Sequence, residues 1–183
     1  MAQNKAHSPI VMAFSGRSNS GKTTLICKLC EYISAQKHTA RIAVIKHDPK
    51  DKAVFDTQGK DSYKFFQRAN AVAVISPTRI TMQAKIESSN ATLTQKNALN
   101  ALLADFKDYD YIFIEGLRDL SGDIAHLRRI VVARGEVDSI YIPYASAFAI
   151  DESVKNAHII PSHIKILDIN HIAHIARYID VNL

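Results

Sequence analysis

The chain has 183 residues, of which 47% are hydrophobic and 22% charged, and its 23 basic residues against 18 acidic ones give a formal net charge of +5. This length suffices for one well-filled core, and the composition excludes a wholly disordered or collagen-like chain. No apolar run approaches the roughly 18 to 20 residues of a membrane span, and none has the form of a signal peptide. We therefore expect a soluble, cytoplasmic protein that does not bind membranes.

The positive charge is spread along the chain rather than gathered in one basic stretch. Such a charge suits an anionic partner such as a nucleotide, but scattered basic residues are more typical of a solvated surface. We therefore expect no binding of nucleic acid. Only two cysteines occur, Cys27 and Cys30, which excludes a secreted-type disulfide framework. Both lie in a predicted helix, where we expect them to pack in the core.

The predicted elements alternate between strands and helices. Short apolar runs predict buried strands, and apolar residues at three- and four-residue spacing predict helices. In chain order we expect a strand over 10–14, a helix over 22–36, a strand over 41–46, a polar loop over 48–59, a helix over 61–68, strands over 71–75 and 79–86, a helix over 92–106, strands over 109–114, 129–133, 140–142 and 164–167, and a helix over 170–179 capped by Asn170.

This alternation predicts one α/β domain over residues 1–183, with a flexible N-terminal tail at 1–9. Its mainly parallel sheet should be covered by helices on both faces.

A glycine-rich motif follows the first predicted strand. Residues 16–23 read GRSNSGKT, a full match to the P-loop pattern G-x-x-x-x-G-K-[ST], between a strand and a helix as that motif requires. The glycines let backbone N–H groups converge on a phosphate, and the helix adds the positive end of its dipole. Lys22 should bridge the β- and γ-phosphates, and the Thr23 hydroxyl should bind Mg²⁺. The residues expected to bind the nucleotide are Gly16, Arg17, Ser18, Asn19, Ser20, Gly21, Lys22, Thr23 and Thr24.

A P-loop also needs an acidic side chain on the magnesium side of the phosphates. Glu115 ends the predicted strand YIFIE, at the edge where ligands of open α/β sheets bind, and Asp48 in the IKHDP stretch is the other candidate. We expect Lys22, Glu115 and Asp48 to act in catalysis, and Thr23, Glu115 and Asp48 to hold the metal. Arg17 could reach a nucleotide on a second subunit, although a solvated arginine is the simpler interpretation.

The base is not specified by any motif, because the guanine-reading N-K-x-D element does not occur. A small-molecule kinase would need a lid with arginines, for which Arg128 and Arg129 or the polar loop over 48–59 are candidates of low specificity. A metallochaperone would need a Cys/His cluster, which the sequence does not offer convincingly.

Five blocks in their order resemble the MobB proteins of molybdopterin-guanine dinucleotide biosynthesis. They are GRSNSGKTTL, IKHD, GKDSYKFFQRANAVAVISP, YIFIEGLRD and ILDINHIAHIARYI, between Val11 and Ile179. The resemblance implies a P-loop protein that binds GTP with Mg²⁺, hydrolyses it weakly and forms homodimers. It also implies a partner, the MobA-type nucleotidyltransferase that attaches GMP to molybdopterin. We therefore expect a weak GTPase that acts mainly as an adaptor in molybdenum cofactor biosynthesis, with a small-molecule kinase and a nucleotide-gated metallochaperone as the alternatives.

Overall fold

The computed structural model describes residues 8–86, 91–117 and 127–181. The chain divides into two compact units: unit 1 comprises residues 1–47 and 101–183, and unit 2 comprises residues 48–100. Residues 1–7 of the predicted N-terminal tail lie outside the described residues. The single domain stays a prediction. Among the described helices, none has both the length and the apolar character needed to cross a membrane.

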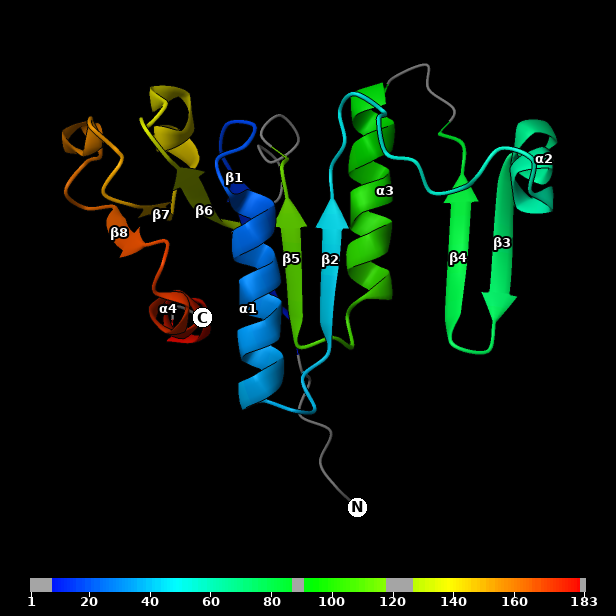
Figure 1. Ribbon diagram of the computed structural model, residues 1–183, viewed down its shortest axis with the longest axis horizontal. Helices are drawn as coiled ribbons and strands as arrows, with labels where there is room; N and C mark the ends of the chain where they lie inside the picture. The colour runs from blue at the N-terminus through cyan, green and yellow to red at the C-terminus, as the bar shows by residue number, and fades with distance from the viewer. Residues whose placement is uncertain (1–7, 87–90, 118–126, 182–183) are drawn as a thin grey trace. The chain divides into compact units, whose positions relative to one another are not determined.

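Unit 1 is built on a parallel sheet of six strands in the order β2-β5-β1-β6-β7-β8 (Figure 1). The strands are β1 (Ile10–Ser15), β2 (Ile42–Lys46), β5 (Tyr111–Glu115), β6 (Arg128–Ala133), β7 (Ala147–Ile150) and β8 (Lys165–Asp168). β1 lies between β5 and β6, with Phe14 opposite Glu115 and Ser15 opposite Val131. Because the strands are parallel, the segments that follow them meet at one edge of the sheet.

Helices cover both faces of this sheet, which confirms the predicted α/β class. On one face, α1 (Lys22–Gln36) and α4 (Ile172–Val181) pack their apolar stripes against alternate strand residues. That core includes Met12, Phe14, Leu25, Leu29, Ile33, Phe113, Ile130, Val132, Ile175 and Ile179. On the other face, residues of the 3₁₀-helices η2 (Ser139–Tyr144) and η3 (Ala157–Ile159) join a second buried cluster with β6 and β7.

Unit 2 contains α2 (Asp61–Arg68) and an antiparallel hairpin of β3 (Ala71–Ser76) and β4 (Arg79–Ala84). The third α-helix, α3 (Ala91–Asp105), begins in unit 2 and ends in unit 1. α2 packs against β3. The hairpin leaves large apolar side chains in solvent, among them Ile75, Ile80 and Met82.

Most predicted elements are confirmed to within two residues, but one strand is wrong. Residues 140–142 belong to η2, where Pro143 lacks an N–H for a strand ladder and Asp138 accepts the N–H of Ile140 at 3.1 Å. The strand that follows is β7, which the sequence analysis missed because its AFAI run is only four residues long. The predicted N-cap is also displaced, since α4 begins at Ile172, two residues after Asn170.

The two cysteines differ in burial. Cys30 packs partly against the core, whereas Cys27 is exposed, so the prediction of core packing is wrong for Cys27. The buried stripe of α1 consists of Leu25, Ile26, Leu29 and Ile33, and the Cys27 side chain lies outside it.

Candidate nucleotide-binding site

The P-loop joins β1 to α1 at the carboxyl edge of the sheet. Its backbone takes positive φ at Gly16 (141°), Asn19 (61°) and Gly21 (97°). A Cβ on Gly16 would lie 2.2 Å from the carbonyl oxygen of Val132, so only glycine can pass this close to β6. Gly21 is the N-cap of α1 and has no side chain to cap the helix, which leaves the first N–H groups of α1 directed at the cavity beside it.

The Lys22 side chain folds back over the loop. Its Nζ donates to the carbonyl oxygens of Gly16 at 3.1 Å and Arg17 at 2.7 Å. Burial lowers the pKa of Lys22, and repulsion from Lys46 lowers it further, while attraction to Glu115 opposes the shift. The Lys22 ammonium group is thus held by two backbone carbonyl oxygens. A phosphate oxygen can take the place of these carbonyls as its hydrogen-bond acceptor.

The two residues predicted to hold the metal in unit 1 are in contact. The hydroxyl of Thr23 donates to Oε2 of Glu115 at 3.0 Å. On the other side of the carboxylate, Nζ of Lys46 lies 3.9 Å from Oε1. Strand register explains the meeting, because Glu115 ends β5 opposite Phe14 of β1 and Lys46 of β2. A hydroxyl beside a carboxylate is a donor set that suits Mg²⁺.

These groups line one open cavity of about 480 Å³. Its lining residues are Ser18, Asn19, Gly21, Lys22, Thr23, Thr24, Lys46, Glu115 and Arg134. The volume lies within the range of small-ligand sites. Lys22 and Lys46 outnumber the single carboxylate of Glu115 among mostly polar lining residues, and this excess of positive charge favours a polyphosphate over an apolar ligand.

The turn after Glu115 is fixed by hydrogen bonds to β1 and to β6, the strand beyond β1. Gly116 and Leu117 both have positive φ, of 98° and 61°. The Gly116 N–H donates to the carbonyl of Phe14 at 2.9 Å, and the Ser15 hydroxyl donates to the carbonyl of Gly116 at 2.8 Å. From β6, Nη2 of Arg129 donates to the carbonyl of Leu117 at 3.3 Å. The backbone that carries Glu115 is therefore tied to β1 and β6.

The lid arginines considered for a kinase do not have the exposure that a lid requires. Arg129 is 2% exposed, and burial lowers its pKa. The Arg128 guanidinium lies over the Tyr178 ring, 5.1 Å from its centroid. Both arginines lie within β6 and not on a loop beside the phosphate site.

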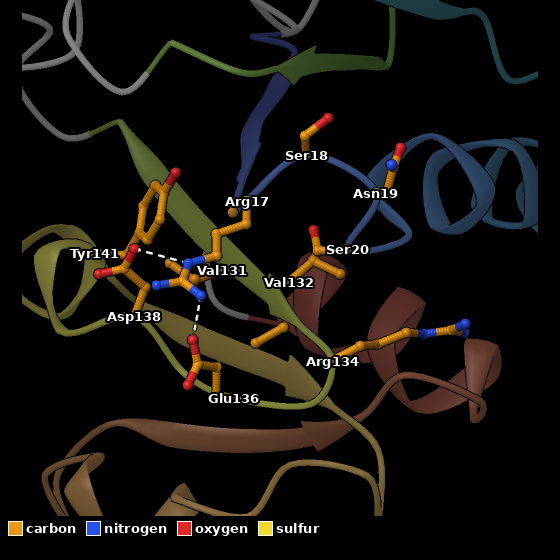
Figure 2. Close-up of a pocket in the computed structure, with 12 residues that line it drawn as sticks. Arg17, Ser18, Asn19, Ser20, Val131, Val132, Arg134, Glu136, Asp138 and Tyr141 are labelled. Carbon is orange, nitrogen blue, oxygen red and sulfur yellow. Dashed lines mark hydrogen bonds and ion pairs between the residues drawn. The ribbon is translucent and has the colours of Figure 1, made fainter.

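The Arg17 side chain is engaged within its own chain. Its Nε donates to Oδ2 of Asp138 at 3.0 Å, and its Nη1 donates to Glu136. The bond to Asp138, followed by that to Glu136, raises the pKa of Arg17. Figure 2 shows the guanidinium between these two carboxylates, with Arg134 directed elsewhere. These residues line a second, smaller cavity of about 120 Å³ beside the P-loop.

Asp48, the other predicted acid, belongs to unit 2. Its carboxylate accepts the backbone N–H groups of Lys50 at 3.2 Å, Lys52 at 2.6 Å and Ala53 at 2.7 Å, so it caps a turn of its own loop. Its role as a metal ligand stays a prediction.

Sequence reasoning missed two residues of this site, Arg134 and Ser15. Arg134 directly follows β6 and pairs with Asp151 at 3.3 Å. Arg134, like Glu115, is a polar residue at the end of a predicted strand. This pattern places Arg134 at the P-loop only once β6 is known to lie beside β1.

Comparisons with known proteins agree with this geometry. The MobB family model, molybdopterin guanine dinucleotide synthesis protein B, matches residues 11–150. No curated protein sequence matches the chain. Three solved structures share the fold.

A molybdopterin-guanine biosynthesis protein B is 21% identical with a TM-score of 0.64, covering 94% of this chain and 99% of that one. A MobB homolog from Bacillus stearothermophilus is 15% identical with a TM-score of 0.61 and the same coverage, 94% and 99%. Bacillus subtilis MobB is 20% identical with a TM-score of 0.61, covering 91% and 96%. The family match includes both the P-loop and Glu115, and the chain therefore belongs to the MobB family of molybdopterin guanine dinucleotide synthesis proteins.

Proposed function

We propose that the chain binds GTP with Mg²⁺ in the P-loop cavity and hydrolyses it slowly, as an accessory protein of molybdopterin guanine dinucleotide synthesis. The observation that carries this proposal is the 3.0 Å contact between Thr23 and Glu115 beside Lys22. GTP is favoured over ATP because the dinucleotide of the family's name contains guanine.

Each part of the cavity has a role in this proposal. The backbone N–H groups from Gly16 to Thr24 bind the phosphates, and Lys22 exchanges its carbonyl partners for phosphate oxygens. Thr23 and Glu115 would hold Mg²⁺, which would neutralise charge on the phosphates. Glu115 also orients the attacking water, since its carboxylate lies at the end of β5 beside the P-loop.

Slow hydrolysis is supported by the state of the nearby arginines. Within the described part of the chain, Arg17 is held by Asp138 and Glu136, and Arg134 is paired with Asp151. Fast GTPases gain about 10³ to 10⁵ in rate from an arginine at the phosphates. The engagement of these two arginines suits an adaptor that works with a MobA-type nucleotidyltransferase.

The hairpin of unit 2 supports the proposal of a homodimer. Ile75, Ile80 and Met82 share one face of the hairpin and are 79%, 73% and 70% exposed. A two-stranded hairpin is only marginally stable alone, and adjacent exposed apolar side chains are typical of an interaction surface. We assign this face to contact with a second copy of the chain.

A nucleotide panel tests the proposed function. Calorimetric titration of the purified protein with GTP and ATP, each with and without Mg²⁺, should give the tightest binding for GTP with Mg²⁺. Equal binding of both nucleotides, or of neither, would contradict it. Phosphate counted in solution and on added acceptors separates a GTPase from a kinase, because a kinase transfers phosphate to the acceptor.

A further inference from the structure

A groove lies at the β8 edge of the sheet in unit 1. Among the described strands, β8 comes last in the order and pairs with β7 alone (Figure 1). The helix α4 packs against β8. Together they line an open cavity of about 460 Å³, formed by Lys165, Ile166, Leu167, Asp168, His174, Arg177, Tyr178 and Val181. The groove shares no lining residue with the nucleotide cavity and is therefore a separate site.

The helix contributes a stripe of its own to this groove. His174, Arg177, Tyr178 and Val181 stand at positions i, i+3, i+4 and i+7, which places them on one face of α4. The buried stripe of α4 packs on the sheet instead. Two apolar side chains at the groove are open to solvent, since Val181 is 70% exposed and Ile166 of β8 is 46% exposed. The groove therefore offers apolar surface as well as polar groups.

The outer side of β8 presents backbone groups to the groove. The N–H of Ile169, just after β8, donates to the carbonyl of Ile150 in β7 at 2.9 Å. Backbone groups along a strand alternate in direction, so Leu167 also faces β7, whereas the N–H groups of Ile166 and Asp168 point away from the sheet. No described strand lies on that side of β8. An edge of this kind can pair with an added strand.

The charges at the groove favour an acidic occupant. Lys165 and Arg177 line it with the single carboxylate of Asp168, and neither cation has an ion-pair partner in the part of the chain that the structure describes. The Asp168 carboxylate accepts the N–H of Asn170 at 2.8 Å, so it is engaged in a turn of its own chain. The whole chain carries a net charge of +5, which disfavours a second copy as the occupant and favours an acidic partner.

We propose that this groove binds an extended acidic segment of a partner protein, which adds to the sheet as a strand beside β8. Its backbone pairs with the outward groups of Ile166 and Asp168. Leu167 belongs to the core that α4 covers, so Lys165, two residues earlier, lies on the same face of the sheet as Arg177. Acidic side chains of the segment meet these two cations. Apolar side chains at the alternate positions meet Ile166 on the reverse face.

A peptide of alternating glutamate and valine tests this proposal. Titration of the full-length protein into fluorescently labelled Glu-Val-Glu-Val-Glu should give a saturable rise in anisotropy. The same peptide with lysine in place of glutamate should bind about tenfold more weakly or worse, because it repels Lys165 and Arg177. The glutamate peptide methylated on every backbone nitrogen should weaken to a similar extent, because it cannot donate to an edge strand. Absence of binding, or equal binding of either altered peptide, would overturn the proposal.

Variants locate the binding at β8 and α4. Ile166→Pro removes an outward N–H, leaves the bonds to β7 in place and should weaken peptide binding about tenfold or more. Ile166→Thr keeps that N–H and should bind the peptide better than Ile166→Pro. Arg177→Glu should also weaken binding about tenfold, whereas Lys28→Glu, the same charge change at an exposed position of α1, should not. Thermal melts confirm folding, and unchanged affinity in both Ile166→Pro and Arg177→Glu would refute the site.

Two further measurements exclude other occupants and other sites. Lys22→Ala should keep peptide binding, because Lys22 does not line the groove; loss of binding would place the peptide in the P-loop cavity and overturn the proposal. The mass of the protein alone in light scattering should be the same for the parent and Arg177→Glu. A lower mass in the variant would assign the groove to a second copy of the chain and overturn the acidic partner. Neither result depends on whether GTP binds.

Discussion

Replacement of Lys22 by alanine tests the P-loop assignment most directly. In the bound state Lys22 would make two charge-assisted bonds to phosphate oxygens, which contribute about 3 to 6 kcal/mol. It would give up its bonds to the carbonyls of Gly16 and Arg17, which together contribute about 1 to 3 kcal/mol. The net loss is about 3 kcal/mol, so the Kd for GTP with Mg²⁺ should rise about 100-fold.

The fold should survive, because Lys22 contributes no packing to the buried stripe of α1. Loss of the two carbonyl bonds costs about 1 to 3 kcal/mol, so Tm should fall by less than about 12 °C. Lys28→Ala, at an exposed position of the same helix, is the matched control and should bind normally. Calorimetric titration gives the affinity and a thermal melt gives Tm. A folded Lys22→Ala protein with parental affinity would refute the assignment of the loop.

Four further outcomes are expected. Because the pKa of Lys22 is lowered, its side chain should lose its proton, and GTP affinity should decline, as pH rises through a range below the ordinary lysine pKa. A Lys22→Arg protein keeps its positive charge and should not show that decline in the same binding series. Thr23→Ala and Glu115→Gln should slow Mg²⁺-dependent hydrolysis of GTP about 100-fold and weaken GTP binding less. A parental rate of hydrolysis in Glu115→Gln would show that Glu115 is not the catalytic acid and would leave Asp48 as the candidate. If Arg17 acts on a second subunit, turnover per subunit should rise with protein concentration and Arg17→Ala should remove the rise, whereas a flat series in both would leave the partner protein as the only source. Ile80→Glu should yield monomers in light scattering while Val54→Glu, also exposed in unit 2, does not; an unchanged mass would exclude the hairpin face.

The features that sequence analysis predicted well are encoded locally. The P-loop is contiguous, and Glu115 ends an apolar run, so both could be recognised before any strand order was known. The alternation of apolar segments likewise predicted the α/β class. The strand over residues 140–142 was wrong because SIYIPY has the composition of a strand, while Asp138 and Pro143 favour a 3₁₀ turn.

The remaining features depend on pairing between distant segments. The Ser15 hydroxyl meets the carbonyl of Gly116 across 101 residues, and no local pattern predicts that bond. The pairing of Arg17 with Glu136 and Asp138 depends in the same way on β6 lying beside β1. The exposure of Cys27 depends on which stripe of α1 faces the sheet.

The position of β1 between β5 and β6 has a consequence for how the protein is made. β1 and the P-loop leave the ribosome early, but both strands that flank β1, and the Val132 carbonyl against which Gly16 packs, lie about 100 residues or more further along the chain. Because this pairing is non-local, the P-loop folds late. The nascent chain acquires its phosphate-binding geometry only after β6 has been synthesised. Nucleotide present at that moment binds the folded sheet and not the open chain, and it shifts the folding equilibrium of unit 1 toward the native state by mass action.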